Sequence, residues 1–330
     1  MAEMMHRYAS VNGLTMHYVE QGEGPLLILC HGFPHTWFSW HRQIPALAAA
    51  GWRVVAPDMR GMGRTSAPVD FRTYDCEHTV GDLVGLLDHL GEQRAVFAGL
   101  DFGVLAIYDM AYRHPERMQA IIGLENPHWP DRPDKTPLAE AAEWASEHFV
   151  HIHDFVSRPD SHTELDADPR EFLKRVYYAL SADYHYLDVW KHPPGTRYID
   201  ALPQAPPLPW PWLSELELEF IVADYAQSGF SGGINWYRAM DLRWHQRAAF
   251  RGRKCTVPFY FIGSVHDVDL EAWHGADPIA EIARQYEDVR RIAMIDKAGH
   301  LMQLERSDEV TRLMLEFLGE IRAGIEGDTR

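Results

Sequence analysis

Three residues that together can carry out nucleophilic catalysis occur along the chain in the order aspartate, aspartate, histidine. They are Asp101, Asp267 and His300, and each follows a short apolar run. A carboxylate can attack carbon to form an alkyl ester, and a histidine oriented by an acid can then activate water to cleave that ester. The order therefore predicts a two-step hydrolysis through a covalent ester on Asp101.

The segment around Asp101 is typical of a sharp turn between a strand and a helix. The strand-like run at residues 94–98 leads in, and an apolar helical pattern starting at Val104 leads out. Gly99 and Gly103 flank the aspartate at the points where such a turn is too tight for a Cβ atom. We expect Asp101 to adopt a strained backbone conformation that aims its carboxylate above the edge of the sheet.

Alternating strands and helices indicate how these residues are positioned. A mostly parallel sheet follows from this alternation, and ligands bind such sheets beyond the carboxyl ends of the strands. All three residues come just after a predicted strand, so we expect them to meet at that edge. We predict a hairpin at 7–19, strands at 26–30, 53–57, 94–98, 120–124, 257–263 and 291–296, and helices at 40–50, 77–90 and near the C-terminus.

The strand pattern breaks after residue 125. Residues 127–137 contain four prolines, and from there to about residue 245 the chain has a helical pattern without strand alternation. Ser214 and Glu217 form a capping box, and the helix that they open is predicted to end at Gly229. We expect an α/β core at 1–129 and 246–330 with an inserted helical cap at 130–245.

Composition narrows the class of partner and the compartment. Lys and Arg number 31 against 48 Asp and Glu, which gives a formal charge of −17 and argues against nucleic acid or an anionic membrane surface as partner. The three cysteines are too few and too far apart for a disulfide framework or a zinc site. The N-terminal stretch has no signal-peptide core, so we expect a cytoplasmic protein.

The loop after the strand at 26–30 supplies candidate groups for stabilising an oxyanion. It reads His31-Gly32-Phe33-Pro34. The backbone N–H of Phe33, together with that of Phe102, is expected to form an oxyanion hole beside Asp101. Pro34 is a candidate for a cis peptide bond that shapes this loop.

These motifs together resemble those of epoxide hydrolases of the α/β-hydrolase superfamily, and the resemblance covers nearly the whole chain. Residues 31–40 resemble the HGFP…W segment of that family, 60–66 its next loop, and 298–305 its histidine loop. The turn around Asp101 departs from the usual G-H-D-W-G, with Leu100 for His and Phe102 for Trp. The resemblance implies an α/β-hydrolase fold, an epoxide and water as substrates, and no cofactor.

The resemblance also implies two hydrogen-bond donors from the cap, which polarise the epoxide oxygen. Residues 232–238 match the segment that holds the second donor tyrosine, so Tyr237 takes that role. The first donor is normally a tyrosine, but counting back from residues 164–166 leads to His151. A minority branch of the family uses such a His/Tyr pair, with an imidazole that we expect to titrate near neutral pH. His153 is the second choice for this donor.

The acid that orients His300 has two candidates. Asp267 fits the commoner position, in the loop after the strand at 257–263, and Glu125 fits the position that some relatives use, at the end of the strand at 120–124. We favour Asp267, with Glu125 as a structural or partial substitute.

Aromatic residues near these motifs are candidates for the wall of the substrate pocket, among them Trp37 and Trp236, together with Pro34. His151 and His153 also form a His-x-His pair, but the acidic and histidine partners of a binuclear metal site are missing. We therefore predict no metal, a small apolar epoxide as substrate, and a chain that is able to form a homodimer.

Two other functions remain open from the sequence. A haloalkane or haloacid dehalogenase uses the same aspartyl ester, but haloacetate enzymes carry arginines directly after the nucleophile and haloalkane enzymes a tryptophan. This chain has Phe102, Gly103, Val104 and Leu105 there. A non-catalytic α/β-hydrolase relative that binds a small molecule is the other alternative, although such relatives often lose a member of the triad and this chain keeps all three.

Overall fold

A computed structural model describes residues 4–129, 133–274 and 277–328 of the chain, with the backbone alone at 324–328. Eight strands form one sheet in the order β1-β2-β4-β3-β5-β6-β7-β8. β1 and β2 form an antiparallel hairpin, β2 pairs antiparallel with β4, and the remaining neighbours are parallel. The strands are β1 (Met5–Val11), β2 (Leu14–Gln21), β3 (Leu26–Cys30), β4 (Arg53–Pro57), β5 (Ala95–Gly99), β6 (Met118–Leu124), β7 (Phe259–Ser264) and β8 (Val289–Ile295).

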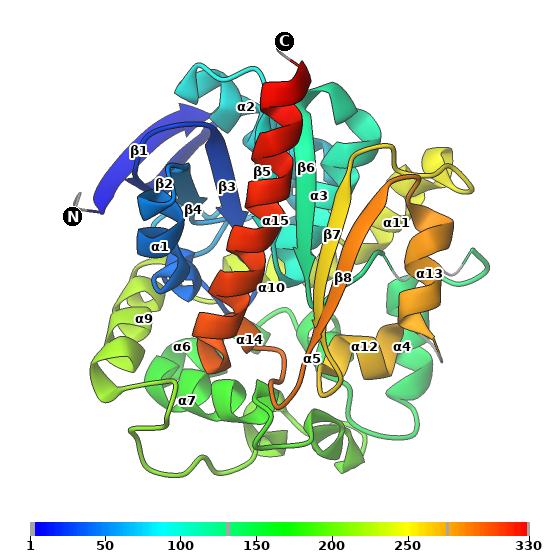
Figure 1. Ribbon diagram of the computed structural model, residues 1–330. Helices are drawn as coiled ribbons and strands as arrows, with labels where there is room; N and C mark the ends of the chain where they lie inside the picture. Colours follow the sequence, from blue (N-terminus) through cyan, green and yellow to red (C-terminus); the bar gives the residue numbers. More distant parts are fainter. Residues whose placement is uncertain (1–3, 130–132, 275–276, 329–330) are drawn as a thin grey trace.

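Helices cover both faces of this sheet (Figure 1). Side chains alternate between the faces along each strand, so that Leu27 and Leu29 pack in one apolar cluster and Ile28 in the other. The first cluster includes residues of α1 and α15, and the second includes residues of α2 and α3. The core helices are α1 (Gln43–Ala49), α2 (Cys76–Leu90), α3 (Asp101–Arg113), α12 (Val268–Trp273), α13 (Pro278–Gln285), α14 (Met302–Glu305) and α15 (Ser307–Asp328). The predicted α/β-hydrolase fold, a mostly parallel sheet flanked by helices, is confirmed.

One predicted helix differs from the structure. The expected helix at 40–50 is divided into a 3-10 helix, η1 (Trp37–Trp40), and the shorter α1. Pro45 lies in the first turn of α1, and in a continuous helix its ring would clash with the carbonyl of residue 41. Thr36 instead caps η1, because its side chain accepts a hydrogen bond from the N–H of Phe38.

A series of helices connects β6 to β7 and gathers at the end of the sheet where the parallel strands terminate (Figure 1). Among them α9 has the predicted capping box, in which Ser214 and Glu217 bond each other's N–H groups, and it ends at Gly229. The residue bounds 130–245 for this cap remain a prediction. The helices are α4 (Pro137–Trp144), α5 (His151–Ser157), α6 (Ser161–Ala167), α7 (Pro169–Leu180), α8 (Tyr198–Ala201), α9 (Glu215–Ser228), α10 (Ser231–Arg238) and α11 (Met240–Arg247).

Short 3-10 turns complete the backbone at η2 (Phe71–Tyr74), η3 (Pro115–Arg117), η4 (Tyr186–Lys191) and η5 (Ala248–Phe250). Within the described ranges, no helix combines the length and the apolar character that crossing a bilayer requires.

Candidate active site

Asp101 lies at the sharp turn between β5 and α3 that the sequence predicts. Its φ angle is +47°, in the left-handed region that non-glycine residues rarely adopt. A Cβ on Gly103 would lie 2.5 Å from the carbonyl oxygen of His31, and one on Gly99 would lie 2.6 Å from Cδ1 of Ile107. The flanking glycines are therefore needed for the close approach of α3 and β3, and the strained turn lifts Asp101 to the end of the sheet.

The Asp101 carboxylate is held by backbone donors. The N–H of Phe33 donates to Asp101 Oδ1 at 2.6 Å, and the Phe33–Pro34 peptide bond in this loop is cis, as predicted. A Cβ on Gly32 would lie 1.8 Å from the same oxygen, so only glycine fits there. Burial acts to raise the pKa of Asp101, but the hydrogen bonds from His300, Phe102 and Phe33 outweigh it and hold the pKa below its ordinary value. The carboxylate is thus ionised and available as a nucleophile.

His300 has a different acid on each side of its ring. Its Nδ1 lies 3.3 Å from Oδ2 of Asp267, while its Nε2 lies 3.3 Å from Oε2 of Glu125 and 3.7 Å from Oδ2 of Asp101. Burial would lower the pKa of His300, but the acidic side chains around it, Asp267 and Asp269 among them, outweigh that effect and raise the pKa well above its ordinary value. The two candidate acids therefore occupy different positions and do not compete for one nitrogen.

Local structure explains where these two acids lie. Asp267 is the N-cap of α12, and its Oδ1 accepts the N–H of Asp269 at 2.7 Å. Glu125 follows β6 with a φ of +67°, and its Oε2 accepts the N–H of Asp101 at 2.8 Å. Burial raises the pKa of Glu125 well above its ordinary value. Glu125 therefore supports the turn around Asp101 as a neutral carboxyl, whereas Asp267 is placed to orient His300.

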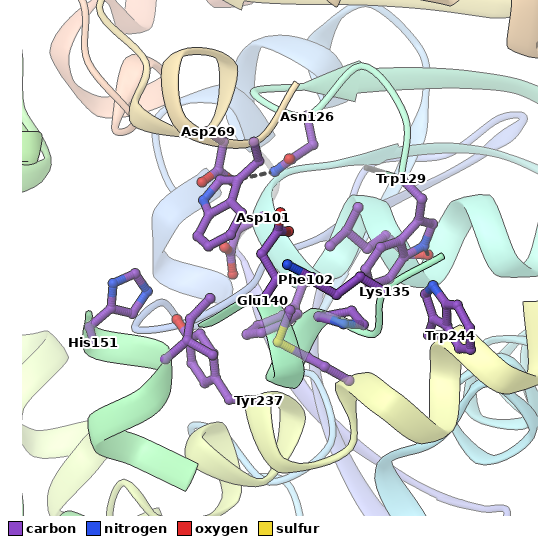
Figure 2. Close-up of a pocket in the computed structure, with 15 residues that line it drawn as sticks. Asp101, Phe102, Asn126, Trp129, Lys135, Glu140, His151, Tyr237, Trp244 and Asp269 are labelled. Atoms are coloured by element: carbon purple, nitrogen blue, oxygen red, sulfur yellow. Dashed lines mark hydrogen bonds between the residues drawn. The ribbon is translucent and has the colours of Figure 1, made fainter. Parts of the chain in front are cut away.

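His151 and Tyr237 lie next to each other on α5 and α10, with ring centroids 5.8 Å apart (Figure 2). The ring of Tyr237 packs edge-on against Phe33 and Phe102. No hydrogen bond joins the Tyr237 hydroxyl to another of the described residues. That hydroxyl is therefore available to a substrate in the cavity.

A chain of two buried tyrosines ends at His151. The hydroxyls of Tyr186 and Tyr198 lie 2.7 Å apart, and the Tyr186 hydroxyl lies 3.2 Å from Nδ1 of His151. When Tyr186 donates to Nδ1, the proton of the neutral ring is on Nε2. Burial lowers the pKa of His151 to about 4, so the expectation that it titrates near neutral pH is wrong. His151 is a neutral N–H donor over the physiological range.

The cavity around Asp101 has two lobes that share Asp101, His151, Tyr237, Asp269 and Trp273. The wider lobe is lined largely by aromatic and apolar side chains, including Phe102, Leu105, Trp129, Met240 and Trp244 (Figure 2). The narrower lobe is lined by Phe33, Pro34, Val176, Leu180, Tyr186, Tyr198 and His300, among others. The nucleophile and both cap donors therefore line both lobes, and His300 lines the narrower one.

Two predicted pocket residues do not line either lobe, and the expectation for them is corrected. Trp37 begins η1 and its ring packs edge-on against Phe38 and Phe220, while its backbone N–H donates to Oδ1 of Asp58. Trp236 is fully buried and donates its indole N–H to the carbonyl of Arg60. Both act as packing beneath the site. His153 is also outside the cavity lining, because a helix turns by about 200° over two residues and carries it away from the face of His151.

Several residues of the site are not predicted from the sequence, among them the polar residues Asn126, Tyr186, Tyr198 and Asp269. Tyr186 and Tyr198 lie in short helices of the cap, where the sequence has no clear period to indicate which side chains face inward. Asp269 is detectable in principle, because it follows Asp267 by two residues in the first turn of a helix whose N-cap is itself a candidate.

Replacing Tyr186 by Phe is expected to lower kcat about 10-fold or more, because outer residues that fix a histidine tautomer typically contribute at that level. The loss of the hydroxyl frees the His151 ring to place its proton on Nδ1, away from the substrate. Steady-state kinetics of Tyr186→Phe and of Tyr184→Phe measure this. Tyr184 lies nearby but lines neither lobe, so its variant should match the parent chain; equal rates for all three proteins would contradict this role.

Comparison with known proteins identifies the family. Epoxide hydrolase A of Mycobacterium tuberculosis is 37% identical over 317 residues, which cover 94% of this chain and 96% of that protein. The chain belongs to the epoxide hydrolase family. The sequence model of the protein family described as the alpha/beta hydrolase fold matches residues 25–150 of this chain. The resemblance inferred from the motifs is thus confirmed.

Solved structures agree with this assignment. A crystal structure of epoxide hydrolase A from Mycobacterium thermoresistibile has a TM-score of 0.88 at 35% identity and covers 96% of this chain and 98% of that one. An epoxide hydrolase from an endophytic Streptomyces has a TM-score of 0.90 at 32% identity and covers 97% and 96%. This epoxide hydrolase family member therefore keeps the family fold over nearly its whole length.

Proposed function

We propose that this protein hydrolyses a small apolar epoxide to a vicinal diol through an ester on Asp101. The observation that carries the proposal is that a carboxylate and two neutral hydrogen-bond donors, Tyr237 and His151, line the same two lobes of one cavity. An epoxide needs this combination, a nucleophile at one carbon and proton donors at the ring oxygen. Family membership supports the same reaction.

In the first half-reaction, Oδ2 of Asp101 attacks an epoxide carbon, since Oδ1 is held by the N–H of Phe33. The carbon–oxygen bond of the ring breaks, and its electron pair goes to the ring oxygen. Tyr237 and His151 hydrogen-bond that oxygen, and Tyr237 gives it a proton. The product of this step is a hydroxyalkyl ester on Asp101.

In the second half-reaction, His300 takes a proton from water through Nε2, while Asp267 orients the ring and stabilises its positive charge through Nδ1. The hydroxide adds to the carbonyl carbon of the ester. The N–H groups of Phe33 and Phe102 stabilise the oxyanion of the tetrahedral intermediate. The alkyl oxygen leaves with the proton from His300, and the diol is released.

The cavity lining supports an apolar substrate. Phe102, Leu105, Trp129 and Met240 contribute to the wider lobe, where a hydrophobic substituent of the epoxide is buried from water. The narrower lobe offers Val176 and Leu180 for a second substituent.

A single turnover in water enriched in heavy oxygen tests the covalent route. With enzyme in excess over a small epoxide such as styrene oxide, the first diol should carry oxygen from Asp101 and remain unlabelled. The heavy oxygen should appear in the peptide that contains Asp101. A labelled diol in the first turnover would mean direct attack of water and would contradict the proposed mechanism.

Replacing either cap donor is expected to slow ester formation. Tyr237→Phe and His151→Gln should each lower its rate by about 10²-fold, because each removes a positioned donor from the developing alkoxide. Rapid-quench measurement of ester formation tests this, with His153→Gln as the matched control on the same helix. A loss in His153→Gln with full activity in His151→Gln would contradict the assignment of the donor.

Location and assembly remain further proposals. Cys30, Cys76 and Cys255 are buried and unpaired, which suits the reducing cytoplasm expected from the sequence. The homodimer and the division into a core and a cap at 130–245 remain predictions, which sedimentation analysis and limited proteolysis test directly.

A further inference from the structure

A fourth carboxylate, Asp269, lies beside the catalytic pair. One side-chain ligand atom each from Asp101, Asp269 and His300 lies within 4.8 Å of the other two. The Nδ2 of Asn126 donates to Oδ2 of Asp269 at 2.6 Å, and Figure 2 marks this bond. The amide of Asn126 is itself oriented by His274, whose Nε2 lies 2.8 Å from its Oδ1. One oxygen of Asp269 is thus held by a hydrogen-bond chain that runs from His274 through Asn126.

Asp269 differs from the other acids around His300 in facing the substrate. Asp267 and Glu125 are both 0% exposed and line neither lobe. Asp269 lines both lobes, together with the cap donors His151 and Tyr237. Within the part of the chain that the structure describes, Asp269 is the carboxylate besides Asp101 that lies near His300 and also lines the cavity.

Any role of Asp269 rests on the proposed function. In that reaction, one proton ends on a group that must be ionised again before the next turnover. Tyr237 gives a proton to the epoxide oxygen and becomes a phenolate. The hydroxide that adds to the ester brings the second proton of the water molecule, and this proton ends on the Asp101 carboxyl when the diol leaves. The next turnover needs an ionised Asp101 and a protonated Tyr237, so a proton must cross the cavity.

We propose that Asp269 carries this proton from Asp101 back to Tyr237. The O–H bond on Asp101 breaks as an O–H bond forms on the free oxygen of Asp269, through one water molecule where the separation requires it. That bond then breaks as the Tyr237 phenolate regains its proton. No other reactant is consumed, and the enzyme returns to its starting state.

The charges around Asp269 suit this transfer. Burial raises its pKa to about 7, an effect that His300 opposes and that Asp267 and Asp101 reinforce. The pKa of Asp101 lies below its ordinary value, and burial raises that of Tyr237 well above 10. Each step therefore passes the proton to a group of higher pKa. The titratable groups that face Asp269 are His300, Asp101, Asp267 and Glu125 from the core and Tyr186 and Tyr237 from the cap.

Rapid-quench kinetics with Asp269→Asn tests the proposal. Asparagine keeps the shape of the side chain and the contact with Asn126 but does not carry the proton. The first turnover should proceed at the rate of the parent chain and give about one diol per site. Later turnovers should be about 10- to 10²-fold slower, which produces a burst. The ultraviolet difference spectrum should show a tyrosinate during the slow phase, and Asp269→Glu should restore the rate.

Glu271→Gln is the matched control, because Glu271 lies on the same helix but is bonded to His185 on the surface. It should behave as the parent chain. A linear time course with unchanged kcat in Asp269→Asn, or a first turnover that is already slow, would overturn the role of Asp269. Failure of the proposed function gives a different result, since the parent chain itself would then form no diol.

Discussion

Asp101→Asn is expected to lose turnover of epoxides by a factor on the order of 10⁴ or more, the level reached when a residue at the centre of a catalytic triad is removed. The amide still accepts the N–H of Phe33, which bonds Asp101 Oδ1 at 2.6 Å, so the turn keeps its shape. What is lost is the anionic oxygen that attacks carbon. The measurement is diol formation at saturating substrate, together with intact mass after incubation with the epoxide.

The fold of this variant should be unaffected. Because hydrogen bonds from His300, Phe102 and Phe33 hold the pKa of Asp101 below its ordinary value, the charge that is removed is a stabilising one, so thermal unfolding should occur at the same temperature or slightly lower. A folded Asp101→Asn protein that still forms diol at a rate near that of the parent chain would show that another group opens the ring.

Asp267→Asn is expected to lower kcat by about 10³- to 10⁴-fold, and Glu125→Gln by only about 10-fold. Asparagine in place of Asp267 allows the ring of His300 to adopt the wrong tautomer and removes the charge that stabilises its imidazolium. Burial keeps Glu125 neutral, so glutamine closely resembles the native carboxyl and can still accept the N–H of Asp101. Rapid-quench measurement of the rate at which the preformed ester is hydrolysed tests both variants.

The double variant decides between separate roles and redundancy. If the two acids act at different nitrogens, as the distances of 3.3 Å to Nδ1 and to Nε2 indicate, the double variant should be close to the product of the two single effects. Modest losses in both single variants with a collapse in the double variant would contradict this and mean that Glu125 substitutes for Asp267.

The scaffold of the site was predictable because its constraints are local. The glycines around Asp101, the loop at Phe33 and Pro34, and the order of the triad each follow from steric needs at one turn, and the structure has that turn and that cis bond. Strand periodicity placed those loops at one end of the sheet, where the structure has them. The one misplaced helix boundary, near Pro45, is also local and was visible in the sequence.

The other features of the site depend on packing between residues that are far apart in the sequence, which the spacing of the motifs does not encode. The neutral state of His151 arises from burial in the assembled cap, and its contact with Tyr186 joins residues that are 35 apart in the chain. Trp37 and Trp236 are close to catalytic motifs in sequence, but their rings turn into the core. Asp269 gains its position from Asn126, which is 143 residues away in the chain. These features require the assembled cap and sheet.

The most direct test of the central claim is the intact mass of His300→Ala after incubation with a small epoxide and, separately, with a bromoalkane. Without His300 the ester on Asp101 forms but is not hydrolysed, so the mass of the protein should increase by that of the whole epoxide. The gain should be absent in a protein that also carries Asp101→Asn. An adduct from the bromoalkane alone would contradict epoxide hydrolysis, because the cap donors would then serve a halide and the protein would be a dehalogenase.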